Sequence, residues 1–167
     1  MNRNTRSLTF DDEEKINDLI LISLKNKDQF FLSELLPTEK NAEAIFATEI
    51  FPIISDGDPA IGIFENDDLL GVTFCSTKLN RFYDFKEACA IGLMTICHPD
   101  FRNQGIGSEL RLELGRQLYK MGIKKFIFEI KCENKASLCN AQKIAKQLSK
   151  DADIKYLRFE AKADDIQ

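Results

Sequence analysis

The sequence predicts an α/β (α+β) fold: a single domain, residues 1–167, with a mixed, mainly antiparallel central sheet flanked by helices. Its 167 residues are the usual size of one domain. Three short apolar segments, 60–64, 69–77 and 88–97, predict neighbouring antiparallel strands, the first two joined by a tight turn at 65–68. A strand, helix, strand pattern over 88–131 then predicts a right-handed crossover between parallel strands.

Two helices are expected before these strands. A short strand at 7–10 precedes Asp11 and Asp12, which supply an N-cap and first-turn negative charge for the first helix. The apolar side of that helix carries Ile16, Leu19, Ile20 and Leu24. A second helical pattern starts near Thr38 and is expected to end before Pro52, because proline interrupts helical hydrogen bonding.

The most regular helix follows the third strand of the meander. Its apolar stripe consists of Leu110, Leu114, Leu118 and Met121, and the side chains expected to face water are Glu109, Arg111, Glu113, Arg116 and Lys120. Gly122 is expected to end this helix in the left-handed conformation. A strand at 125–131, a helix capped by Asn134 and a last strand at 154–161 follow.

Composition narrows the classes of function. The net charge of −4 argues against a nucleic-acid partner, whose binding relies on Lys and Arg. No apolar run approaches the ~20 residues that cross a bilayer, and residues 1–10 lack the apolar segment of a secretory signal, so we expect no membrane partner and a cytoplasmic location.

The cysteines and the single histidine do not form a pattern typical of a metal site. Cys75, Cys89, Cys97, Cys132 and Cys139 contain no C-x-x-C pair and are interpreted as reduced thiols, mostly in the core. His98 follows Cys97, and neighbours on a strand point to opposite faces, so the two do not make a nucleophile system. We therefore expect no bound metal.

Candidate binding residues lie between the third strand and the leucine-striped helix. Gly105 and Gly107 remove Cβ atoms where the chain turns into the helix, so backbone N–H groups can approach an anion at the positive end of the helix dipole. A phosphate site is one interpretation and a plain turn is another. The segment is neither a dinucleotide fingerprint, because Leu110 occupies the third glycine position, nor a P-loop, because no Lys follows.

The string Arg102-x-x-Gly105-x-Gly107 resembles the acetyl-CoA motif, Q/R-x-x-G-x-G/A, of the GNAT N-acetyltransferase superfamily. The resemblance implies a GNAT-type sheet in which a loop holds the CoA pyrophosphate through backbone N–H groups, and the residues of this loop are Arg102, Asn103, Gln104, Gly105, Ile106, Gly107 and Ser108. It also implies that Ile96 and Cys97 pair with pantetheine, and that a bulge separates the strands around Cys97 and Ile130. A backbone N–H near Cys97 would face the thioester oxygen.

A second segment, 126–134, is similar to the L-x-L-E-V-R-x-x-N motif of ribosomal-protein N-terminal acetyltransferases. This similarity implies that Glu129 is the general base and that Asn134 contacts the cofactor. The tyrosine that protonates the departing thiolate in that group is replaced by Ala141, the K-L-G-F that follows is missing, and one strand of the usual closing hairpin is expected to be absent. Cys139 and Tyr156 are the candidates for a substitute acid.

These observations predict an acetyltransferase that moves acetyl from acetyl-CoA to a primary amine, in a small molecule or at a protein N-terminus or lysine, by direct attack in a ternary complex. Residues 78–85 and the aromatic pair Phe30 and Phe31 are candidates for acceptor recognition, and a monomer or homodimer is expected. One alternative is an acyl-CoA-binding protein with little transfer activity. Another is an interaction protein in which the two glycines only make a turn.

Overall fold

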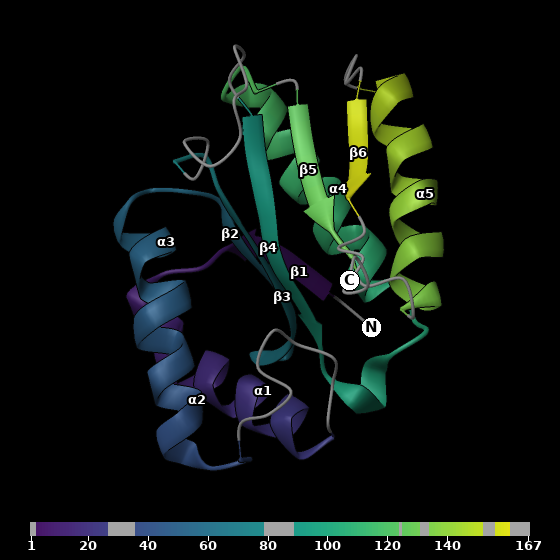
Figure 1. The fold of residues 1–167 in the computed structure, drawn as a ribbon. Helices are drawn as coiled ribbons and strands as arrows, with labels where there is room; N and C mark the ends of the chain where they lie inside the picture. The colour runs from purple at the N-terminus through teal and green to yellow at the C-terminus, as the bar shows by residue number, and fades with distance from the viewer. Residues whose placement is uncertain are drawn as a thin grey trace, which may run out of the picture.

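A six-stranded sheet forms the centre of the computed structural model, which describes residues 3–26, 36–78, 89–123, 125–130, 134–151 and 156–160. The strands lie side by side in sequence order: β1 (Arg3–Ser7), β2 (Ala60–Glu65), β3 (Asp68–Ser76), β4 (Cys89–Cys97), β5 (Lys125–Glu129) and β6 (Tyr156–Glu160). Neighbours from β1 to β4 are antiparallel, whereas β4, β5 and β6 run parallel. The predicted meander, crossover and mixed sheet are confirmed (Figure 1).

Helices cover both faces of this sheet. Figure 1 shows α1 (Glu13–Lys25), α2 (Glu39–Ile45) and α3 (Phe51–Ser55) on one side and α4 (Ile106–Lys120) and α5 (Lys135–Asp151) on the other. A π-helical turn, η2 (Phe46–Ile50), joins α2 to α3, and 3-10 turns, η1 (Phe10–Asp12) and η4 (Pro99–Phe101), precede α1 and α4. Each helical layer has its own apolar core against the sheet.

The predicted apolar stripes of α1 and α4 are buried, with one exception, and contribute to the two cores. Ile16, Leu19, Ile20 and Leu24 are at most 5% exposed on α1, and Leu110, Leu114 and Leu118 at most 1% exposed on α4. Met121 is 50% exposed, so its place in the stripe was predicted wrongly. Met121 follows the last helical residue as the C-cap, and Gly122 after it is left-handed at φ 79°, as expected.

Two predicted boundaries are wrong for physical reasons. The first strand is β1, ending at Ser7, rather than a strand at 7–10; it is an edge strand of polar residues, which carries no apolar alternation to reveal it. The helix at 38–51 does not end before Pro52. The wider π turn of η2 precedes that proline, and Pro52 lies in the first turn of α3, where its missing N–H breaks no helical hydrogen bond.

Some predictions fall outside the described residues. These include Phe30, Phe31, Cys132 and most of 78–85, so acceptor recognition stays a prediction. In the part of the chain that is described, Cys75 and Cys89 are buried as expected, and Cys139 is exposed. None of the described helices is both long and apolar enough to span a bilayer.

Candidate active site

An opening between β4 and β5 is the first component of the site. The two strands pair from Cys89 with Lys125 to Gly92 with Phe128, and the pairing ends there although β4 continues to Cys97. On the other edge of β4, Phe74 pairs with Met94 and Cys75 with Gly92, so Leu93 is an extra residue and forms a bulge. The predicted separation is therefore present, with its bulge at Leu93 rather than beside Cys97.

The loop after β4 is held in place at both ends. The His98 amide donates to the Leu70 carbonyl at 2.8 Å, and the His98 ring Nδ1 accepts from the Asp100 amide at 3.3 Å, which starts η4. Further along, the Arg3 guanidinium on β1 donates to both the backbone and the side-chain oxygen of Gln104, at 3.2 and 2.7 Å. The loop thus enters α4 on a fixed path.

The backbone at the start of α4 presents N–H groups. The first amides bonded within the helix are those of Ser108 and Glu109, which both donate to the Gly105 carbonyl at 3.0 Å. The amides of Gly105, Ile106 and Gly107 therefore have no acceptor among the described residues, as expected for the first turn of a helix. We call these three amides the α4 cradle.

Glycine geometry keeps the cradle open. Gly105 adopts φ 85°, a left-handed conformation that side chains rarely adopt, and a Cβ there would meet nothing within 4 Å. A Cβ on Gly107 would lie 3.5 Å from Cys97 Sγ and 3.8 Å from Asn140 Nδ2. Gly107 therefore faces the space between the end of β4 and α5, next to the opening.

The structure brings together the predicted cofactor residues of β4, the loop and α4. Ile96 is buried and Cys97 half-buried at the end of β4. Arg102, which is exposed, folds back toward that strand and donates from Nε and Nη2 to the Cys97 carbonyl, each at 3.4 Å. Asn103 has a left-handed backbone, at φ 61°, so the chain turns here as well as at Gly105.

Among the predicted residues of β5, α5 and β6, Glu129 lies where the pairing with β4 has ended and Tyr156 does not. Glu129 is the last residue of β5, beyond the final pair with β4. Asn134 caps α5, its Oδ1 accepting from the Ser137 amide at 3.0 Å. Cys139 is exposed on α5. Tyr156 pairs with Lys125 and Glu129 with Glu160, so Tyr156 lies at the opposite end of β5 from Glu129, roughly 13 Å along the strand direction.

A buried arginine is the residue that sequence reasoning missed. Arg111, expected to face water, is only 7% exposed. Its guanidinium donates to the Ser137 hydroxyl at 2.8 Å, the Asn140 Oδ1 at 3.2 Å and the Ser137 carbonyl at 3.4 Å. Burial lowers the pKa of Arg111, and the Cys97 sulfur opposes that shift. The signal was available: Arg111 is three residues before Leu114 and seven before Leu118, on the stripe face.

The described residues hold no group of three or more His, Cys, Asp or Glu side chains that could bind a metal ion. Within the same residues, α4 and α5 meet in a polar cluster of three neutral side chains and one cation, Ser108, Ser137, Asn140 and Arg111, with Asn140 Nδ2 donating to Ser108 Oγ at 2.9 Å. Together with the α4 cradle, this arrangement favours an anionic group.

Comparisons with known proteins identify the fold. No protein-family model matches the sequence, and no curated protein sequence matches it. Among solved structures, an N-acetyltransferase of Staphylococcus aureus superposes with a TM-score of 0.68 and 19% identity, covering 87% of this chain and 83% of its own. The PaiA N-acetyltransferase of Thermoplasma acidophilum, in complex with coenzyme A, superposes with a TM-score of 0.66 and 21% identity. The match covers 86% of this chain and 88% of the PaiA chain.

A ribosomal-protein-alanine N-acetyltransferase of Brucella melitensis is similar to the same extent, with a TM-score of 0.65 and 18% identity over 84% of this chain and 82% of its own. A structure described as a GNAT family acetyltransferase also matches. At these identities the likeness concerns the fold, and it extends over most of each chain. The chain has the fold of the GNAT N-acetyltransferases.

Proposed function

We propose that the protein is an N-acetyltransferase that moves the acetyl group of acetyl-CoA to a primary amine by direct attack in a ternary complex. The observation that carries this proposal is the α4 cradle, which lies beside an opening between β4 and β5 in a GNAT fold. A protein of the same fold, PaiA of Thermoplasma acidophilum, was crystallised with coenzyme A, and the Brucella protein is named for acetylating an alanine amine.

The residues present fit a diphosphate-containing cosubstrate. Three amides without an acceptor among the described residues, at the positive end of a 15-residue helix, suit the negative charge of a diphosphate. The space beside Gly107 that a Cβ would enter lets an anion approach this backbone. In this proposal 102–108 hold the diphosphate, the edge of β4 at Ile96 and Cys97 pairs with pantetheine, and the Asn134 amide contacts the arm from α5.

The transfer step needs little beyond positioning and charge stabilisation. Acetyl-CoA supplies an activated thioester, so the protein needs no nucleophile of its own. A backbone N–H near Cys97 stabilises the negative charge that develops on the thioester oxygen as the amine attacks. Because Cys97 lies beyond the last paired residue of β4 with β5, an acceptor can approach it through the opening.

Glu129 takes the proton of the attacking amine in this proposal, directly or through water. An α-amino group, with a pKa of ~7.7–8.0, is neutral in roughly a quarter of molecules near pH 7.4, but a lysine at ~10.4 in only about one in a thousand. The Glu129→Gln substitution is therefore expected to reduce kcat/KM far more for a lysine acceptor than for a peptide N-terminus, and to leave CoA affinity unchanged.

The departing CoA thiolate has little need of a proton donor. A thiol pKa of ~8.5 makes the sulfur a good leaving group near neutral pH without protonation. Cys139 and Tyr156 remain the candidate acids, and the separation of Tyr156 from Glu129 along β5 favours Cys139. The rate of acetyl transfer in the single variants Cys139→Ala and Tyr156→Phe shows which of the two residues acts as the acid.

The cradle is tested by a matched pair of glycine substitutions. Gly105 and Gly57 both have positive φ, 85° and 73°, and both have open space around a Cβ, so Gly105→Ala and Gly57→Ala each lose about 1 kcal/mol of stability through the same backbone strain. Only Gly105→Ala is expected to weaken CoA binding in calorimetry, by ten-fold or more. Equal CoA affinity in the two variants contradicts the placement of the diphosphate.

A second candidate function is acyl-CoA binding without efficient transfer. The observation that favours it is Ala141, fully buried in the core beside α4, at the position where the motif that 126–134 resembles is followed by a tyrosine acid. Both candidates bind CoA. Turnover of acetyl-CoA with a panel of peptides and polyamines, lost in Glu129→Gln, selects the transferase; CoA binding with no turnover on any amine selects the binding protein.

A further inference from the structure

A chain of hydrogen bonds connects the buried Arg111 to the α4 cradle. The Arg111 guanidinium donates to Asn140 Oδ1 at 3.2 Å, and the same amide donates from Nδ2 to Ser108 Oγ at 2.9 Å. Arg111 is 7% exposed, and Ser108 lies next to Gly107 in the first turn of α4. These hydrogen bonds thus lead from Arg111 on α4 to Asn140 on α5 and back to Ser108 on α4, next to the cradle.

Hydrogen-bond polarity is fixed along this chain. A guanidinium can only donate, so the Asn140 side chain must present its oxygen to Arg111 and its NH2 group to Ser108. The Ser108 oxygen is therefore an acceptor in that contact, and its own hydrogen must be donated elsewhere. The carbonyl one helical turn back, that of Gln104, already accepts from Arg3 at 3.2 Å.

We propose that Arg111 is a positioning residue that acts through Asn140 to make the Ser108 hydroxyl a hydrogen-bond donor to a phosphate oxygen in the α4 cradle. This inference rests on the proposed function, because the phosphate is that of CoA. Arg111 does not touch the phosphate. Its effect on binding is transmitted by the orientation of the Asn140 amide.

A double-mutant cycle on CoA affinity tests the proposal, with calorimetry as the measurement and thermal unfolding as the check on folding. Ser108→Ala removes the donor and is expected to weaken CoA binding about ten-fold, the effect of one charge-assisted hydrogen bond. Arg111→Met allows the Asn140 side-chain amide to rotate and exchange its oxygen and nitrogen, and it is expected to weaken CoA binding several-fold. In the double variant, Arg111→Met is expected to add no loss to that of Ser108→Ala.

Three further variants separate positioning from a structural role. Arg111→Lys keeps a donor-only cation, so it should recover part of the affinity that Arg111→Met loses. Ser137→Ala removes the hydroxyl that accepts from Arg111 at 2.8 Å, a hydrogen bond that does not lead to Ser108. This variant should therefore be less stable but keep its CoA affinity within two-fold. Asn140→Asp, which can only accept, reverses the Ser108 hydroxyl and should weaken CoA at least as much as Ser108→Ala.

The outcomes are distinguishable from failure of the proposed function. If the unaltered protein does not bind CoA, the proposed function and this inference both fall. If it binds CoA and Ser108→Ala binds equally well, the donor role of Ser108 is wrong while the function stands. If Arg111→Met weakens CoA by the same factor with and without the Ser108 hydroxyl, Arg111 acts independently and the positioning role is overturned.

Discussion

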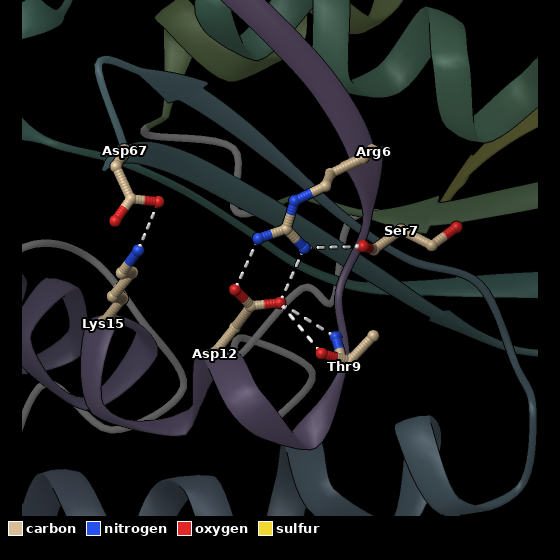
Figure 2. A network of polar contacts seen from close by, with 6 residues as sticks. All are labelled: Arg6, Ser7, Thr9, Asp12, Lys15 and Asp67. Atoms are coloured by element: carbon tan, nitrogen blue, oxygen red, sulfur yellow. Dashed lines mark hydrogen bonds and ion pairs between the residues drawn. The ribbon is translucent and has the colours of Figure 1, made fainter.

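Asp12 and Arg6 form an ion pair that holds β1 to the start of α1. The Arg6 guanidinium donates to both Asp12 oxygens, at 2.6 and 2.7 Å (Figure 2). It also lies 4.0 Å from the centre of the Phe64 ring. Asp12 Oδ2 also accepts from the Thr9 amide at 3.0 Å. The hydrogen bond from Arg6 is the main cause of a pKa below the ordinary range for Asp12.

The lowered pKa of Asp12 predicts a pH-dependent contribution to stability. Because the folded pKa is below the unfolded value of ~3.9, the pair stabilises the protein at neutral pH, and this contribution is lost as pH falls through the folded pKa. Asp12→Asn is expected to lower the free energy of unfolding by about 1–2 kcal/mol at pH 7 and by progressively less below pH 4. Urea unfolding of both proteins across this range measures the difference.

Asp67 provides the matched control, because it also pairs with a cation, Lys15, at 2.6 Å, but is 83% exposed. Asp67→Asn keeps a residue that tolerates the left-handed backbone there and should change stability by less than about 0.5 kcal/mol. A loss in Asp12→Asn that stays constant with pH, or that equals the loss in Asp67→Asn, contradicts this account of the pair.

Individual residues also mark the limit of sequence reasoning. The glycines of the cradle, the Asn134 cap and the Gly122 terminus were predictable because each serves a local backbone need. Arg111 was not recognised, because a charged residue within an apolar stripe is ordinarily assigned to solvent, and its hydrogen-bond partners Ser137 and Asn140 come from another helix. Contacts between elements distant in sequence leave no periodic signal.

At the scale of elements, close approach of α4 to the sheet places the cradle beside β4. A Cβ on Gly71 of β3 would lie 2.8 Å from Ile106 Cγ2 and 2.9 Å from the Ile96 carbonyl, closer than real contacts. Ile106 is the first residue of α4 and Ile96 lies near the end of β4. The absence of a side chain at Gly71 therefore sets where the helix begins relative to the opening.

Gly71→Ala is expected to destabilise the protein by about 1–3 kcal/mol, because the backbone carbonyl cannot move away as a flexible side chain could. Gly107→Ala is the control, since its Cβ would make only ordinary contacts of 3.5 Å or more. Its stability in urea should change by less than about 1 kcal/mol, although its CoA affinity should fall. A Gly71→Ala protein as stable as the parent shows that α4 packs less tightly than described.

The types of most elements were predictable from periodicity. Element boundaries were not predictable where tertiary contacts decide them. β1 is a strand because it pairs with β2, with Thr5 reaching Glu109 of α4 at 2.7 Å, rather than because of its own pattern. The helix from Thr38 continues past Pro52 because η2 widens to a π turn and keeps Phe46 and Ile50 in the core. No local rule at Pro52 indicates that turn.

At the scale of the whole molecule, the proposed cosubstrate bridges three elements, β4, α4 and α5, which meet around Gly107. Binding to the folded state alone raises stability by mass action, by about 2.7 kcal/mol at 100 times the Kd. For a chain of this size that predicts a rise of roughly 5–10 °C in Tm with CoA. Pantetheine, which lacks the diphosphate, is expected to give a much smaller rise at equal concentration, and equal rises contradict a binding site centred on the cradle.

The order of strands and helices was predictable because the apolar residues of the meander strands and the apolar stripe of α4 are both buried in the core, and each pattern is visible in the sequence. Within the residues described, β5 and β6 pair directly and in parallel, and the expected absence of one strand of the closing hairpin stays a prediction. The loop after β4 and the start of α4, which form the candidate site, were predictable as a loop and a helix start. The position of the bulge at Leu93 was not, because it depends on the register of β4 against both neighbours.

The most direct measurement of the central claim is a crystal structure of the protein with CoA bound. The account predicts diphosphate oxygens within about 3 Å of the amides of Gly105, Ile106 and Gly107, with pantetheine running along β4 toward Cys97. A diphosphate bound elsewhere on the surface, or a saturated complex in which these amides contact only water or the protein's own side chains, contradicts it.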